Sequence, residues 1–157
     1  MNFVKSLAWL VVALVLQQTV VRLAAMHNAR PDLVLIALVG ISLRYGSVYG
    51  LYCGLLIGLV QDVYAIDHLG ANALAKCVTG YFVGLLDERT VKIMPVTKVL
   101  LLGGGFILHD FIYLWAAGLR NAAYLEALYK VSAPSFIYTL LVAALVYSLT
   151  MNRSRLS

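Results

Sequence analysis

Apolar and polar positions divide the chain into six apolar stretches joined by short polar or glycine-containing segments. The stretches cover residues 3–25, 31–43, 46–64, 70–86, 96–118 and 131–151. A helix needs about 20 mostly apolar residues to cross a bilayer, and its backbone hydrogen bonds are then satisfied internally. The pattern therefore predicts an all-α polytopic membrane protein, with six transmembrane helices in a single domain over residues 1–157.

The second stretch is the shortest, because residues 31–43 supply only 13 positions. At 1.5 Å per residue this is about 20 Å of helix, whereas the hydrocarbon core is about 30 Å thick. We expect a helix that is short or displaced within the bilayer. If this stretch only dips into the membrane, five helices cross it and the two termini lie on opposite sides.

Glycine recurs at every fourth position in the third stretch. The positions are Gly46, Gly50, Gly54 and Gly58. Because four residues turn about 400°, three consecutive glycines share one face of a helix and the fourth does not. In a membrane, small residues at this spacing let a second helix approach closely.

Two partners are open for this glycine face. One is the membrane-spanning helix of another protein. The other is the fourth stretch, which has its own glycines four apart, Gly80 and Gly84. We favour internal packing, because consecutive elements joined by a short connection usually lie side by side.

The composition supports a protein that lies almost entirely within the bilayer. Hydrophobic residues make up 62% of the chain, charged residues 12%, and the mean hydropathy is +0.90. A soluble domain is closer to half apolar and a quarter charged. The composition leaves no room for an aqueous domain, which excludes most enzyme classes. The net charge is +5, but the basic residues form no long run, so we expect no nucleic-acid partner.

Basic residues at the ends of the stretches predict the orientation. With six spans and a cytoplasmic N-terminus, seven basic residues lie inside: Lys5, Arg44, Arg89, Lys92, Lys98, Arg153 and Arg155. Four lie outside: Arg22, Arg30, Arg120 and Lys130. Cytoplasmic segments carry the excess of Lys and Arg, so this count favours both termini in the cytoplasm.

Three ionisable residues fall inside or at the edge of the stretches: Asp62, Lys76 and Asp110. In this topology all three belong to the outer half of the bilayer. Charged residues at such a depth usually pair with one another or mark an ion or ligand path. We expect Asp62 and Lys76 to pair and to fix the hairpin between stretches three and four. A proton path or a ligand site is the alternative.

Several other polar residues complete the predicted site. Gln61 and Asn72 lie beside the intervening loop, which they could cap or bridge, and they join the predicted polar network. His109 is expected to be a polar packing residue. Pro31 and Asp32 are expected to begin the second helix, and Gly70 the fourth.

Motifs for catalysis or cofactors are missing from the sequence. It has no nucleophile with a base at a recognisable spacing, no phosphate-binding loop and no pair of histidines on one helix turn. Cys53 and Cys77 have no metal-ligand spacing and are expected to be packing residues. We therefore expect no catalytic residue, no cofactor and no metal.

One run of residues resembles a known family. Gly58-Leu59-Val60-Gln61-Asp62 is followed by Leu69-Gly70-Ala71-Asn72-Ala73-Leu74-Ala75-Lys76 and Gly80-Tyr81. Upstream stand Arg30-Pro31-Asp32 and Arg44-Tyr45-Gly46. The run covers about residues 30–85 and is similar to MreD, the rod shape-determining membrane protein family of bacteria.

The resemblance implies a non-enzymatic scaffold in the bacterial inner membrane. MreD proteins bind MreC, which has one span and a periplasmic domain. They act alongside MreB, RodA and its penicillin-binding transpeptidase in rod-shape maintenance and lateral peptidoglycan synthesis. The implied fold is similar to the six-helix substrate-binding subunits of energy-coupling-factor transporters.

This implied fold leaves a second function open, a small-molecule-binding transporter subunit. Such a subunit should enclose a polar-lined cavity and meet its energising partner through small residues on the first stretch. Here Ala8 and Ala13 are five positions apart, which argues against a small-residue face with a spacing of four. A lipid flippase is a third alternative.

Overall fold

A computed structural model describes residues 3–21, 32–64, 69–86, 95–118 and 128–154, and within these ranges the chain is helical and has no strands. The helices are α1 (Phe3–Leu16), η1 (Gln17–Val21), α2 (Leu33–Tyr45), α3 (Ser47–Tyr64), α4 (Ala71–Gly84), α5 (Pro95–Ala116), η3 (Leu128–Ser132) and α7 (Ala133–Ser154). Each α-helix overlaps one predicted apolar stretch. The all-α prediction is therefore confirmed for the described residues.

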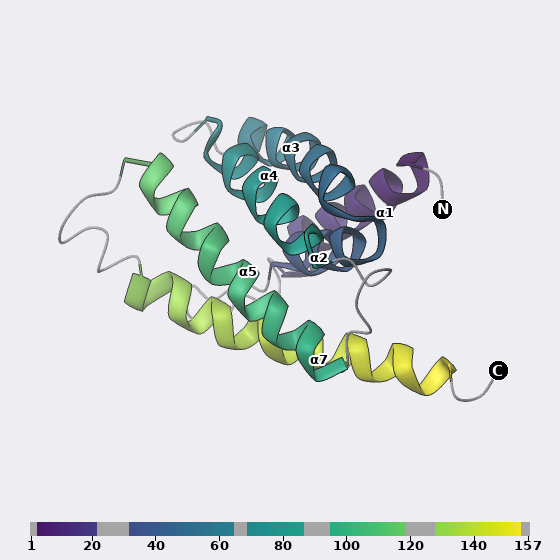
Figure 1. Cartoon of the computed structure of the whole chain (residues 1–157). Helices are drawn as coiled ribbons and strands as arrows, with labels where there is room; N and C mark the ends of the chain where they lie inside the picture. Colours follow the sequence, from purple (N-terminus) through teal and green to yellow (C-terminus); the bar gives the residue numbers. More distant parts are fainter. Residues whose placement is uncertain (1–2, 22–31, 65–68, 87–94, 119–127, 155–157) are drawn as a thin grey trace.

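The helices are arranged as a tight group and a looser pair (Figure 1). Helices α1 to α4 pack together, with α3 and α4 side by side over α2. Helix α5 lies along α4, and α7 crosses α5 and then continues away from the group. Helices α5 and α7 diverge toward the C-terminal end of α5.

The short second helix lies at the centre of the packing. Helix α2 has 13 residues, of which eight are buried, and it contacts α1, α3, α4, α5 and α7. One core cluster joins α2 to α1 and α3, including Leu10, Leu38 and Cys53. A second joins α2 to α4, α5 and α7, including Val39 and Leu102. Most of the surface of this short helix is therefore covered by other helices.

Two helices are long and apolar enough to cross a membrane in the described part of the chain. They are α3, over Ser47–Tyr64, and the Val96–Ala116 part of α5. The other apolar segments found are shorter: Lys5–Thr19, Leu33–Tyr45 and Tyr129–Leu145. Six complete spans and the positions of the termini stay predictions.

Burial is inverted relative to a water-soluble protein. Large apolar side chains lie on the surface, and Trp9 and Trp115 are 63% and 71% exposed. Charged side chains lie inside, and Asp62 and Lys76 are only 2% and 1% exposed. Exposed apolar surface on this scale is unusual in soluble monomers, whereas buried charges facing the bundle interior are typical of membrane proteins. The packing therefore fits a lipid environment.

Candidate functional site

The glycine face of α3 packs on α4. A Cβ atom placed on Gly50 would meet the carbonyl oxygen of Gly80, and one placed on Gly54 would meet the carbonyl oxygen of Lys76. A Cβ atom on Gly58 would likewise meet the backbone of Ala73. The two backbones are in direct contact, so no other protein's helix fits between them. This contact, which we call the glycine seam, corresponds to the internal-packing alternative.

The fourth glycine of the series has a different role. Gly46 lies before α3, has a φ of 91° and caps α2, where its N–H donates to the Ser42 carbonyl at 2.8 Å. A positive φ is easily adopted only by glycine. On the other side of this turn, a Cβ atom on Gly84 would meet the backbone of Ser47. Three glycines thus share the face, and Gly46 makes the turn before it.

Asp62, at the C-terminal end of α3, caps the N-terminus of α4. Its Oδ1 accepts a hydrogen bond from the Asn72 N–H, and its Oδ2 accepts one from the Ala73 N–H, each at 3.0 Å. The residue at the N-cap position, Gly70, has a φ of 90° and no side chain to satisfy these groups. A carboxylate is stabilised here because the first N–H groups of a helix carry partial positive charge.

This geometry corrects the expected pairing of Asp62 with Lys76. Asp62 does connect the α3 and α4 hairpin, but it does so through backbone N–H groups. A helix N-terminus supplies two aligned donors, so the carboxylate needs no lysine. Lys76 lies one turn further along α4 and points to other partners.

Lys76 lies inside a group of four residues, Asp32, Lys76, His109 and Asp110, which we call the polar centre. Its Nζ lies 3.4 Å from Asp32 Oδ2 and 3.0 Å from His109 Nε2. Three different helices meet at this nitrogen, because Asp32 caps α2, Lys76 belongs to α4 and His109 to α5. The ammonium group therefore connects the tight helix group to α5.

His109 links Lys76 to Asp110. A charged lysine donates to Nε2, so the imidazole is neutral and carries its hydrogen on Nδ1. Nδ1 lies 3.4 Å from Asp110 Oδ1, in position to donate to it. The ring also stacks on Tyr113, at 6.1 Å between centroids. His109 therefore packs on Tyr113 and also bridges Lys76 to Asp110, a link that the sequence did not predict.

Asp32 ties the start of α2 to its neighbours. Its Oδ1 accepts from the Leu35 N–H at 2.9 Å, which makes it the N-cap residue. Its own N–H donates to Thr139 Oγ1 on α7 at 3.1 Å. The Val34 N–H donates to Gln17 Oε1 at 3.1 Å. Asp32 thus begins the helix as expected, and it is also the ionic partner of Lys76, which the sequence did not reveal.

The remaining predicted residues contribute less to the site. The Oε1 atom of Gln61 is buried and has no hydrogen-bond partner among the described residues. Asn72 contributes its backbone N–H to Asp62. The loop that Gln61 and Asn72 were expected to bridge, residues 65–68, lies outside the described residues, and so does Pro31.

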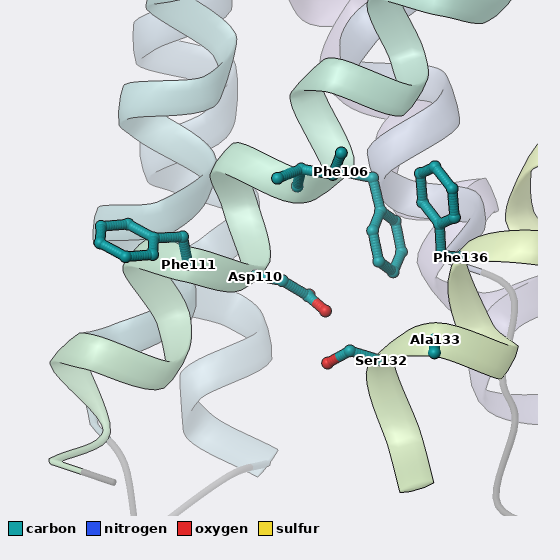
Figure 2. A pocket seen from close by; sticks show the side chains of 7 residues that line it. Phe106, Asp110, Phe111, Ser132, Ala133 and Phe136 are labelled. Atoms are coloured by element: carbon teal, nitrogen blue, oxygen red, sulfur yellow. The ribbon is translucent and has the colours of Figure 1, made fainter. Parts of the chain in front are cut away.

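Asp110 also borders a pocket between α5 and α7 (Figure 2). The pocket has a volume of about 280 Å³ and its lining is mostly apolar. Phe106, Phe111 and Phe136 lie around it. The Asp110 carboxylate and the Ser132 hydroxyl point toward each other across the opening.

The arrangement is suited to holding helices together rather than to catalysis. Lys76 is 1% exposed and its neighbours occupy the space around its ammonium group. Within the described ranges, no group of three or more His, Cys, Asp or Glu side chains could hold a metal ion. Both cysteines are free thiols, and Cys53 is part of the core as expected.

Comparison with known protein families matches residues 1–153 to the family described as rod shape-determining protein MreD. The chain belongs to the MreD family. Searches of curated proteins and of solved structures found no match. The match extends the likeness from the central run to nearly the whole chain, and it establishes a role in rod-shape determination. The likeness to energy-coupling-factor subunits stays a prediction.

The central run of this MreD family member coincides with the tightest part of its fold. Gly58 lies in the glycine seam, Asp62 caps α4, and Lys76 forms the polar centre. The most recognisable residues of the sequence are therefore engaged in contacts within the chain.

Proposed function

We propose that this protein is a non-enzymatic scaffold of the bacterial cell-elongation complex that binds MreC in the inner membrane. It supports rod-shape maintenance and lateral peptidoglycan synthesis, and it acts indirectly with RodA, the penicillin-binding transpeptidase and MreB. Membership of the MreD family supports the role in rod shape. The finer assignment to MreC binding is what the resemblance to this family implies.

The observation that carries the proposal is the enclosure of two charged side chains, Lys76 and Asp62. Intramembrane charges often mark ion paths or ligand sites, and such a site needs an open coordination position or a water-filled cavity. Here Lys76 has two partners within the chain and 1% exposure. Asp62 uses both carboxylate oxygens on α4. The contacts of Lys76 and Asp62 favour a structural role for these two residues. We therefore infer that the protein functions through contacts between the surface of the helix bundle and a partner.

The proposed topology has six spans with both termini in the cytoplasm. The excess of basic residues on that side supports it. The two long helices α3 and α5 and the apolar surface of the bundle support insertion in the membrane. In this arrangement the chain presents helix faces to the lipid, where a single-span partner is accessible.

A small-molecule-binding transporter subunit is the second candidate. The pocket between α5 and α7, beside Asp110, is the observation that favours it. A transporter site for a polar solute should be lined by polar groups, whereas this pocket has few of them. The scaffold is therefore the function that the geometry supports better.

Affinity purification from a bacterial membrane in mild detergent, followed by mass spectrometry, distinguishes the two. The scaffold predicts stoichiometric recovery of MreC. Recovery of an ATPase pair with its coupling subunit, without MreC, would refute the scaffold and favour transport. In both cases we expect the chain itself to have no catalytic activity.

A further inference from the structure

The pocket between α5 and α7 is at the lower limit of size for a small-molecule site. Its volume is about 280 Å³, whereas drug-sized ligands occupy pockets of about 300–1,000 Å³. Its lining comes from α5 and from the start of α7, two helices that diverge toward the C-terminal end of α5 (Figure 1). A space of this size and shape accommodates one or two large side chains that project from a neighbouring helix.

Asp110 provides the polar end of this pocket. Its Oδ1 faces His109, while its Oδ2 has no hydrogen-bond partner among the described residues. Figure 2 shows the carboxylate pointing into the space beside Phe106 and opposite Ser132. A carboxylate in apolar surroundings is strongly disfavoured unless a donor or a cation pairs with it.

Among the residues that the structure describes, the charges of the polar centre leave Asp110 without a counter-ion. Lys76 is positive, Asp32 is negative, and these two lie 3.4 Å apart. His109 is neutral when it accepts from Lys76, so it supplies a hydrogen bond but no charge. The four residues therefore sum to one negative charge, and Asp110 is the member that borders the open pocket.

We propose that a membrane-spanning helix of a partner protein docks between α5 and α7 and places a basic side chain on Asp110. The rings of Phe106 and Phe136 receive the apolar stem of that side chain, and the carboxylate pairs with its charged end. This inference rests on the proposed function, because it assumes that the chain works through a membrane partner, and it names the face that binds it.

The depth of Asp110 favours a helix over a lipid headgroup. Asp110 lies six residues before the end of α5 at Ala116, which is about 9 Å along the helix. A lipid amine lies in the headgroup layer, whereas a lysine or arginine on a helix can be placed at any depth.

Site-specific photo-crosslinking in native membranes tests the docking face. Phe111 on α5 and Phe82 on α4 offer a matched pair, because they are 59% and 52% exposed. A photo-reactive phenylalanine analogue replaces one or the other in the full chain. We expect capture of MreC from position 111 about tenfold above position 82. Equal capture from both positions, or capture of lipid alone at position 111, would overturn the proposal.

A charge exchange tests the role of the carboxylate. Asp110→Asn should lower MreC recovery about tenfold, the effect of losing one good ionic contact. Asp110→Lys should abolish recovery. Recovery should return when a basic residue in the MreC span is replaced by Glu. The melting temperature of each variant in detergent verifies that it is folded.

The outcomes separate this inference from the proposed function. If the wild-type chain recovers MreC and both Asp110 variants do so equally, the docking face is wrong while the scaffold stands. If the wild-type chain recovers no MreC, the scaffold fails first. If both Asp110 variants fold and lose MreC, but no reversed charge in the partner restores it, the direct ionic contact is refuted.

Discussion

The hairpin of α3 and α4 and the pair of α5 and α7 show two ways to pack membrane helices. In the hairpin, glycines bring the backbones into contact, and Gly54 lies on the Lys76 carbonyl. In the other pair, bulky side chains meet, and the rings of Phe106 and Phe136 lie 5.5 Å apart between centroids. Small residues produce a closed seam, whereas large residues hold two helices apart and leave a pocket beside them.

The pairing of charged groups differs between these two regions in the same way. In the hairpin, both oxygens of Asp62 are satisfied by α4. Beside α7, Asp110 has one oxygen directed to His109 and the other directed into the pocket. In the hairpin, the cost of burying the Asp62 charge is met within the chain, whereas our proposal assigns the pairing of Asp110 to a partner. The following substitutions test that difference.

Removing the ammonium group of the polar centre should have the largest effect. Lys76→Met leaves the Asp32 carboxylate without its ionic partner, and breaking a buried ion pair from one side costs about 3–5 kcal/mol. The free energy of unfolding in detergent measures this loss. Lys5→Met, at an exposed lysine of α1, is the matched control and should change little. Equal stabilities of the two variants would contradict the ion pair.

Removing the charge and one acceptor oxygen from the Asp62 cap should have the next largest effect. Asp62→Asn keeps one acceptor oxygen and loses the charge, so one of two hydrogen bonds to α4 is lost. Hydrogen bonds to charged groups contribute about 1.5–3 kcal/mol each. Denaturant titration should show a loss in this range. Combined with Lys76→Met, the loss should be additive, because the two residues share no contact. Strong coupling between the two substitutions would instead support a direct Asp62–Lys76 pair.

Adding one methyl group should distinguish the seam from the open face of α5. Gly54→Ala places a Cβ atom against the Lys76 carbonyl, and overpacking typically costs about 1–3 kcal/mol. Gly104→Ala meets no atom within 4 Å and should not lower stability. Thermal unfolding of the two variants makes the comparison. A stable Gly54→Ala variant would mean that the seam is looser than the contacts indicate.

Filling the α5 and α7 pocket should have the smallest effect on stability. Ala133 is exposed and lines the pocket, so Ala133→Leu adds apolar volume where space exists. We expect a change within about 0.5 kcal/mol, as for most surface substitutions. Recovery of MreC should nevertheless fall, because the occupied space excludes the partner side chain. Normal recovery would show that this pocket does not serve binding.

Much of the fold could be predicted from the sequence because its signals are local. Apolar stretches and their breaks place the helices, and the spacing of the glycines identifies the face that meets α4. The capping role of Asp32 also follows from its position just before an apolar run. Each of these features depends on neighbouring residues and on the geometry of one helix.

The polar centre could not be predicted, because its members are far apart in the sequence. Lys76 pairs with Asp32, 44 residues earlier, and reaches His109, 33 residues later. Asp62 was the nearer and more obvious partner for Lys76, but the N-terminus of α4 competes for that carboxylate. His109 looked like a packing residue because a single histidine on an apolar helix has no local signature.

The central claim is that the Asp32–Lys76 ion pair serves structure and that the function lies in partner contact. The double variant Asp32→Asn with Lys76→Met removes both charges together, so it should recover part of the stability lost in Lys76→Met alone. Cell shape is then measured in a rod-shaped bacterium whose own copy has been replaced. Our account predicts that this variant, once shown to be folded in the membrane, maintains rods. Folded protein with round cells would show that the charges themselves carry the function.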